Sequence, residues 1–112
     1  MAIENFLSGV QYPIARAYAA VESARLMRNK AAQMFDEGAN PGEEANLAKF
    51  LGAEAAWQAA NMCMDTYGGY GYAREYNIER KFREARLYMV APVTNNLVLN
   101  YIGQNVLGLP RS

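Results

Sequence analysis

Apolar and small residues recur at helical spacing along almost the whole chain, and no segment alternates convincingly at the two-residue period of a strand. The segment from Pro41 to Tyr67 carries a seam of small residues, namely Ala45, Ala48, Gly52, Ala55 and Ala59. Small side chains let two helix backbones approach closely, whereas a glycine without such a role costs a helix about 1 kcal/mol relative to alanine. The pattern therefore predicts an all-α chain with close helix packing along this seam.

Glycine and proline residues divide this pattern into four predicted helices. The helices span about Tyr12 or Pro13 to Glu37, Pro41 to about Tyr67, about Ile78 to Val90, and about Val93 to Leu107. Gly38 suits the left-handed position after a helix end, and Asn40 and Pro41 suit an N-cap and a first helical position. Gly108 and Pro110 end the last helix. We predict one domain, residues 1–112, folded as an antiparallel helix bundle.

Two of these helices have a clear inner face. In the first helix, small and apolar residues step by four and three positions along one side. They are Ala20, Ala24, Met27, Ala31 and Met34. The third helix has a corresponding stripe of Ile78, Phe82, Ala85 and Met89. We expect both stripes to be inner faces of the bundle.

The composition excludes several classes of function. Eleven basic and eleven acidic residues cancel among 112, so we expect neither a nucleic acid nor a membrane surface as partner. The absence of histidine excludes His-based triads, His metal sites and His proton shuttles, and we expect no metal site. Cys63 is the single cysteine and cannot form an internal disulfide, which indicates a reducing, cytoplasmic setting. No signal peptide and no membrane-spanning run are recognisable.

A glycine-rich turn follows the second helix, in the sequence from Asp65 to Tyr72. Glycines after a helix let the backbone approach a ligand closely and point N–H groups at an anion. By itself, such a turn is more simply interpreted as a helix terminator. Both interpretations stay open on the residues alone.

A charged helix and a proline-headed segment come next. Glu79 and Arg83 are spaced to form an ion pair on the helix surface, worth only about 0.2–0.5 kcal/mol. Pro92 then starts the segment Pro92-Val93-Thr94. Acidic residues of the charged helix are flanked by arginines, so surface ion pairs are favoured over a catalytic role for them.

The order of glycine turn, charged helix and proline-headed segment resembles the C-terminal helical domain of acyl-CoA dehydrogenases. The resemblance covers the chain from Gln11-Tyr12-Pro13-Ile14 to Ile102. It implies a homo-oligomeric flavoenzyme of fatty acid metabolism that desaturates acyl-CoA thioesters, with FAD as hydride acceptor and an electron-transfer flavoprotein as partner. An acyl-CoA oxidase, which passes electrons to oxygen, is an equally open reading of the same residues.

The resemblance also implies which residues contact the flavin. Gly68 and Gly69 match the loop that touches the diphosphate end of a flavin held mainly by a neighbouring subunit. Asp65 stands where the family often has glutamine, and an unpaired carboxylate would repel a diphosphate. Thr94 and Asn96 match positions that contact the flavin in relatives, although helix capping explains both equally well.

No catalytic residue is carried over. In many relatives a glutamate two residues before the threonine removes the substrate α-proton, and here Pro92 occupies that position. Proline has no titratable group and cannot act as the base. Other relatives place the glutamate on an earlier helix of the domain, and the resemblance begins after that helix. We therefore expect the isolated chain to be inactive and to expose an apolar face where the earlier helix would pack.

A non-catalytic module is the alternative. Pro92, Asp65 and the expected uncovered face would equally suit a helical domain used for oligomerisation or for binding a partner subunit. Solution mass and bound flavin distinguish the two, because a stable oligomer without flavin favours the module.

Overall fold

The computed structural model describes residues 3–111, and the side chains from Gly9 onward. Four α-helices dominate, namely α1 (Ile3–Asp36), α2 (Gly42–Tyr67), α3 (Ile78–Val90) and α4 (Asn95–Tyr101). Two short 3-10 turns, Gly68–Tyr72 and Arg74–Tyr76, join α2 to α3, and a π-helical segment, Ile102–Val106, follows α4. Within residues 3–111 there is no strand. The all-α prediction is confirmed.

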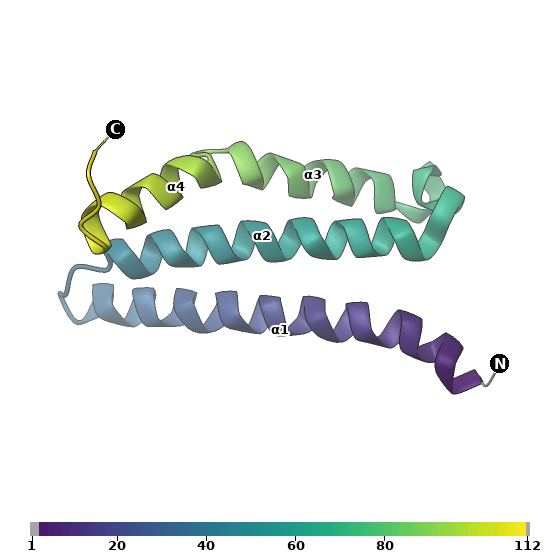
Figure 1. Cartoon of the computed structure of the whole chain (residues 1–112). Helices are drawn as coiled ribbons and strands as arrows, with labels where there is room; N and C mark the ends of the chain where they lie inside the picture. Colours follow the sequence, from purple (N-terminus) through teal and green to yellow (C-terminus); the bar gives the residue numbers. More distant parts are fainter. Residues whose placement is uncertain (1–2, 112) are drawn as a thin grey trace.

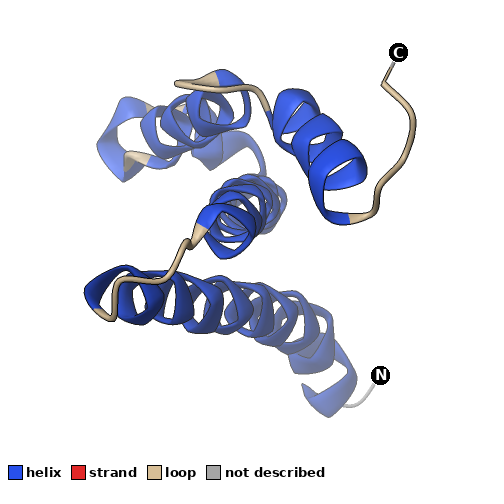
Figure 2. Ribbon diagram, turned by 90° about the vertical axis from the view of Figure 1, so that its left-hand side faces the viewer, coloured by secondary structure: helices blue, strands red, loops and turns tan. Residues whose placement is uncertain are grey.

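Helix α2 lies at the centre of the molecule (Figure 1). It runs antiparallel to α1 on one side, and α3 and α4 return one after the other along its other side. Viewed along the bundle, α2 separates α1 from the α3–α4 row (Figure 2). The particle is elongated, with extents of 52 × 29 × 27 Å. The predicted antiparallel bundle is therefore confirmed, with α2 as its middle member.

The predicted start of the first helix is wrong. Helix α1 begins at Ile3, well before Tyr12 or Pro13, and Pro13 lies inside it. A proline within a helix removes one backbone hydrogen bond and bends the axis, but its φ angle is compatible with continued helix. The ribbon of α1 accordingly bends toward its N-terminal end (Figure 1).

The last predicted helix also differs. Instead of one helix from Val93 to Leu107, α4 covers only Asn95–Tyr101 and then widens into the π-helical turn. The Leu107 N–H donates to the Ile102 carbonyl oxygen at 3.1 Å, across five residues. Helical periodicity alone does not reveal such a widening, because it is confined to about one turn at the end of the helix.

Several helix boundaries follow from the conformational preferences of single residues. Gly38 has a φ of 81° and Gly108 a φ of 70°, so both adopt the left-handed conformation that glycine tolerates best. Helix α2 begins at Gly42, so Pro41, not Asn40, immediately precedes it. The Gly42 N–H nevertheless donates to Asn40 Oδ1 at 3.0 Å. The predicted capping by Asn40 is thus shifted by one position.

The core is thin and made of small side chains. Both predicted inner stripes are turned inward, and no residue of either is exposed. Yet the buried hydrophobic residues of the described part are only Ala31, Ala53, Ala55, Ala85 and Val98. None of its large side chains is fully buried. Ile14, Tyr18 and Phe35 lie along one side of α1 and are 51%, 67% and 72% exposed. The expected uncovered apolar face is therefore present.

The prediction that Gly52 lets another helix approach α2 closely is wrong for the residues that the structure describes. A Cβ atom built at Gly52 would have no neighbouring atom within 4 Å. No described helix therefore uses the absence of a side chain there to approach α2 closely.

None of the described helices is long and apolar enough to cross a membrane.

We expect Gly52→Ala to raise the free energy of unfolding by about 1 kcal/mol, because alanine is the better helix former and the new methyl group enters open space. Urea unfolding followed by far-ultraviolet circular dichroism measures the change. Gly71→Ala is the control, since its Cβ would lie 3.1 Å from the Met64 sulfur and should give no gain. Equal stabilisation by both substitutions would contradict the packing around them.

Candidate functional site

The glycine turn starts where α2 ends. Gly68 has φ 58° and ψ −135°, and its N–H donates to the Met64 carbonyl oxygen. The chain then winds through the two 3-10 turns, in which Gly71 is buried against Met64. Gly68 and Gly69 are exposed, and a Cβ at either would meet nothing within 4 Å. Their backbone is therefore accessible to a ligand or to another chain.

Tyrosines surround this turn. The Tyr76 ring lies 5.8 Å from the Tyr67 ring and 5.7 Å from the Tyr70 ring, the latter pair edge-to-face. Such geometry is favourable for aromatic pairs. Together with Thr66 they border an open hollow of about 420 Å³.

Asp65 lies on the last turn of α2 and is exposed. It has no ion-pair partner among the described residues. The local charge is therefore unfavourable for a diphosphate, which would meet the carboxylate directly. Asp65 is therefore the residue of this turn that would weaken the binding of a diphosphate.

Helix α3 is attached to α2 by aromatic packing. The Trp57 and Phe82 rings lie 4.9 Å apart, and the Arg86 guanidinium lies 5.0 Å from the Trp57 ring centre. The predicted pair of Glu79 and Arg83 is confirmed at 3.1 Å. The remaining ion pairs of this helix join Glu84 to Arg80 and Lys81. All of them stay within α3, so they do not connect the helix to the glycine turn.

The chain between α3 and α4 contains a cis peptide bond before Pro92, and Pro92 is exposed. Thr94 caps α4, because its Oγ1 accepts a hydrogen bond from the Leu97 N–H at 3.2 Å. The capping interpretation of Thr94 is therefore confirmed. Accepting this bond leaves the hydroxyl proton free to donate to a ligand.

Lys49 is a residue whose role sequence reasoning missed. Its Nζ donates to the Tyr88 carbonyl oxygen at 2.8 Å and to Asn95 Oδ1 at 2.5 Å. It thereby ties the first half of α2 to the last turn of α3 and the first turn of α4. The carbonyl end of a helix favours a cation. No sequence signal shows this contact, because its partners lie 39 and 46 residues away along the chain.

Asn95 completes this tie. It is only 5% exposed, and its Nδ2 contacts the Met89 sulfur at 3.5 Å.

Burial lowers the pKa of Lys49 from its ordinary value of 10.5. The unfolded chain then holds that proton more tightly, so the contribution of Lys49 to stability rises as the pH increases through the window between the lowered pKa and 10.5.

The structure divides the five predicted flavin-contacting residues between two places. Asp65, Gly68 and Gly69 precede α3, whereas Thr94 and Asn96 follow it. Helix α3 has 13 residues, which corresponds to about 20 Å at 1.5 Å per residue. A compact site containing all five is therefore excluded within one chain.

Comparison of the sequence with known proteins identifies the family of this chain. Residues 7–107 match the family model described as the acyl-CoA dehydrogenase C-terminal domain. The chain belongs to the acyl-CoA dehydrogenase family. Acyl-CoA dehydrogenase FadE12 of Mycobacterium tuberculosis is 41% identical over 106 residues, which are 93% of this chain and 27% of that protein.

Other relatives are named for different activities. The short/branched chain specific acyl-CoA dehydrogenase of rat mitochondria is 32% identical over 98 residues, or 88% of this chain and 23% of that protein. The 3-(aryl)acrylate reductase of Clostridium sporogenes is 33% identical over 98 residues, or 88% of this chain and 26% of that protein. The chain thus spans about a quarter of the length of these relatives.

The chemistry of the described side chains fits a supporting role at a flavin better than a catalytic one. The Thr94 hydroxyl can donate a hydrogen bond, and the exposed glycine backbone permits a close approach. Asp65 does not fit a diphosphate. Among the described residues, no three His, Cys, Asp or Glu side chains are grouped as a metal site would require.

We expect Lys49→Met to lower the free energy of unfolding by about 1–2 kcal/mol, since the buried Asn95 amide oxygen and the Tyr88 carbonyl lose their donor. Chemical denaturation measures the loss. Lys30→Met, on an exposed part of α1, is the matched control and should change stability by less than about 0.5 kcal/mol. Similar losses in both variants would contradict the assigned tie.

We expect Thr94→Val to cost about 1 kcal/mol of unfolding free energy, because the valine cannot accept the Leu97 N–H bond. Thr94→Ser keeps the hydroxyl and should retain most of the stability. The same denaturation experiment compares the two. A valine variant as stable as the serine variant would show that the cap does not contribute.

Proposed function

We propose that this chain is the FAD-contacting and oligomerisation domain of an acyl-CoA dehydrogenase-like flavoenzyme that oxidises the α,β bond of an acyl-CoA. The match of residues 7–107 to the acyl-CoA dehydrogenase C-terminal domain is the observation that carries the proposal. The dehydrogenases among the relatives favour this reaction over that of an oxidase. The complete enzyme would work as a homo-oligomer in the cytoplasm and deliver electrons to an electron-transfer flavoprotein.

Thr94 and Asn96 would contact one part of the flavin, and Gly68 and Gly69 the diphosphate end of a flavin held by a neighbouring subunit. The two groups lie beyond opposite ends of α3, a helix about 20 Å long, and this supports the division, because one chain would serve two flavins. FAD supplies the hydride acceptor when it is bound. The residues of this chain would position the flavin, and none of them would take the substrate α-proton.

The chain by itself would be inactive. Pro92 stands at the position of the usual glutamate and has no titratable group. Glu79 and Glu84 on α3 are engaged in ion pairs with basic neighbours. We therefore expect the base that removes the substrate α-proton to be a residue other than Pro92, Glu79 and Glu84.

A partner-binding module without flavin chemistry is the second candidate. The exposed apolar side chains of α1, among them Tyr12, Tyr18 and Leu26, favour it. This candidate predicts a stable complex with no bound flavin.

A chimaera tests the proposal. The matching 106-residue segment of FadE12 is replaced by this chain, and flavin content and acyl-CoA-dependent flavin reduction are measured. We expect the chimaera to retain FAD, while the isolated chain shows no flavin reduction with acyl-CoA. A chimaera that assembles like its parent yet binds no FAD would contradict the proposal and favour the module.

We expect Asp65→Gln in this chimaera to strengthen FAD binding about fivefold, because removing one charge about 4 Å from a phosphate is worth about 1 kcal/mol in water. Flavin fluorescence titration gives the dissociation constant. Asp36→Gln, at the far end of α1, removes the same charge away from the turn and should have no effect. Equal effects of both substitutions would show that Asp65 does not face the diphosphate.

A further inference from the structure

Lys49 has two properties that bear on a ligand bound at the start of α4. Its Nζ donates to two uncharged acceptors, the Tyr88 carbonyl oxygen and Asn95 Oδ1. These bonds attach Lys49 to the segment that carries Thr94 and Asn96. Its ammonium group also has no ion-pair partner among the described side chains.

The hold of Lys49 spans the connection between α3 and α4. The Tyr88 carbonyl oxygen belongs to the last turn of α3, and Asn95 is the first residue of α4. Both bond to the same ammonium group of α2. The connection of residues 91–94 is therefore fixed to α2 at both of its ends.

Asn95 passes this hold on to its neighbours in the chain. Its side chain is engaged at both ends, because Oδ1 accepts from Lys49 Nζ and Nδ2 contacts the Met89 sulfur. The residues on either side of it are Thr94, which is half-buried, and Asn96, which is exposed. Fixing the buried Asn95 therefore fixes the backbone from which Thr94 and Asn96 extend.

The positive charge of Lys49 is uncompensated among the described side chains. On α2 itself, Glu44 and Glu54 are each five positions away, which turns them to another side of the helix. Lys49 borders two hollows of about 430 and 220 Å³. Two further charged groups line these hollows, Arg25 and Arg28 of α1, and both are cations.

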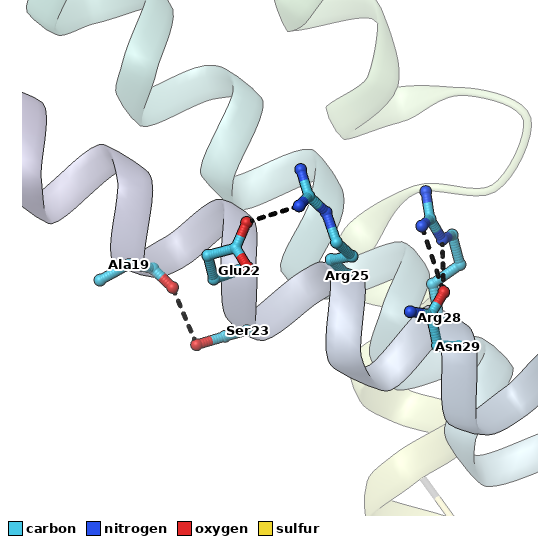
Figure 3. Close-up of polar contacts among 6 residues, drawn as sticks. All are labelled: Ala19, Glu22, Ser23, Arg25, Arg28 and Asn29. Carbon is cyan, nitrogen blue, oxygen red and sulfur yellow. Dashed lines mark hydrogen bonds and ion pairs between the residues drawn. The ribbon is translucent and has the colours of Figure 1, made fainter.

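The acidic groups on the neighbouring helices are engaged elsewhere. On α1, Glu22 pairs with Arg25, and Arg28 bonds to the neutral side chain of Asn29 (Figure 3). On α3, Glu84 borders the next hollow along α2 and pairs with two basic residues of its own helix. The net charge around the two hollows beside Lys49 is therefore positive.

This charge lies close enough to act on a ligand of Thr94. Because Lys49 Nζ bonds to Asn95 Oδ1 and adjacent Cα atoms are about 3.8 Å apart, the ammonium group lies within about 12 Å of the Thr94 hydroxyl. At that separation and an effective dielectric constant of about 20, one unit charge changes an equilibrium that involves another about tenfold.

The reduction of a flavin is such an equilibrium, because electron uptake makes the ring more negative and a nearby cation favours that state. We propose that Lys49 is a positioning residue for FAD, which holds Thr94 and Asn96 in place through Asn95 and raises the reduction potential of the bound flavin through its unpaired charge. This role rests on the proposed contact of Thr94 and Asn96 with FAD.

The chimaera of FadE12 that carries this chain tests the role. Its dissociation constant for FAD and its two-electron reduction potential are measured with Lys49 intact and in the variant Lys49→Met. We expect Lys49→Met to weaken FAD binding about fivefold, because a hydrogen-bond donor is lost. The potential should fall by about 30 mV, which corresponds to tenfold for a two-electron couple. Lys30→Met removes the same charge at an exposed position of α1 and should change neither quantity.

Two further variants separate the charge from the hold. Lys49→Arg keeps the positive charge and the donors, so it should retain both the affinity and the potential. Asn95→Asp keeps the shape of the side chain but pairs with Lys49, so the potential should fall as in Lys49→Met while FAD stays bound. If Lys49→Met loses its flavin altogether, Asn95→Asp decides. A potential that Asn95→Asp leaves unchanged would overturn the role.

The flavin content of the unaltered chimaera distinguishes this role from the proposed function. A chimaera that assembles but binds no FAD with Lys49 intact would refute the proposed function and the role of Lys49 together. A chimaera that binds FAD at one and the same potential in Lys49→Met and Lys30→Met would refute the role of Lys49 alone.

Discussion

The packing of α2 between α1 and the α3–α4 row is the constraint on which the rest of the structure depends. Trp57 near the middle of α2 holds α3, and Lys49 nearer its start holds the end of α3 and the start of α4. The core around α2 is thin, because the buried hydrophobic residues of α2 are the small residues Ala53 and Ala55. Directional contacts such as the Lys49 hydrogen bonds therefore matter more here than in a thick apolar core.

This arrangement explains why the two predicted groups of flavin-contacting residues are held apart. Helix α3 is a rigid spacer between the glycine turn and Thr94, and aromatic packing fixes it on α2. A domain built this way can present the two groups to different ligands or to different subunits. The same construction leaves open hollows beside α2, one bordered by α1 and another by α3.

Much of the fold was predictable because helix formation depends on residues close together in the chain. The inner stripes of α1 and α3, the left-handed Gly38 and the pair of Glu79 with Arg83 all follow from spacing within a few turns. The failures have a common cause. The continuation of α1 through Pro13 and the open space above Gly52 depend on which helices lie nearby, and periodicity carries no such information.

The sequence by itself determined the helical class, the breaks between helices, the family resemblance and the absence of a titratable group at Pro92. These properties reside in residue type and local spacing. Only the tertiary structure decided that Lys49 holds α3 and α4. It alone decided that Thr94 and the glycine turn lie beyond opposite ends of α3 as it packs on α2, and that Gly52 faces open space. Such contacts join residues dozens of positions apart, so no local pattern specifies them.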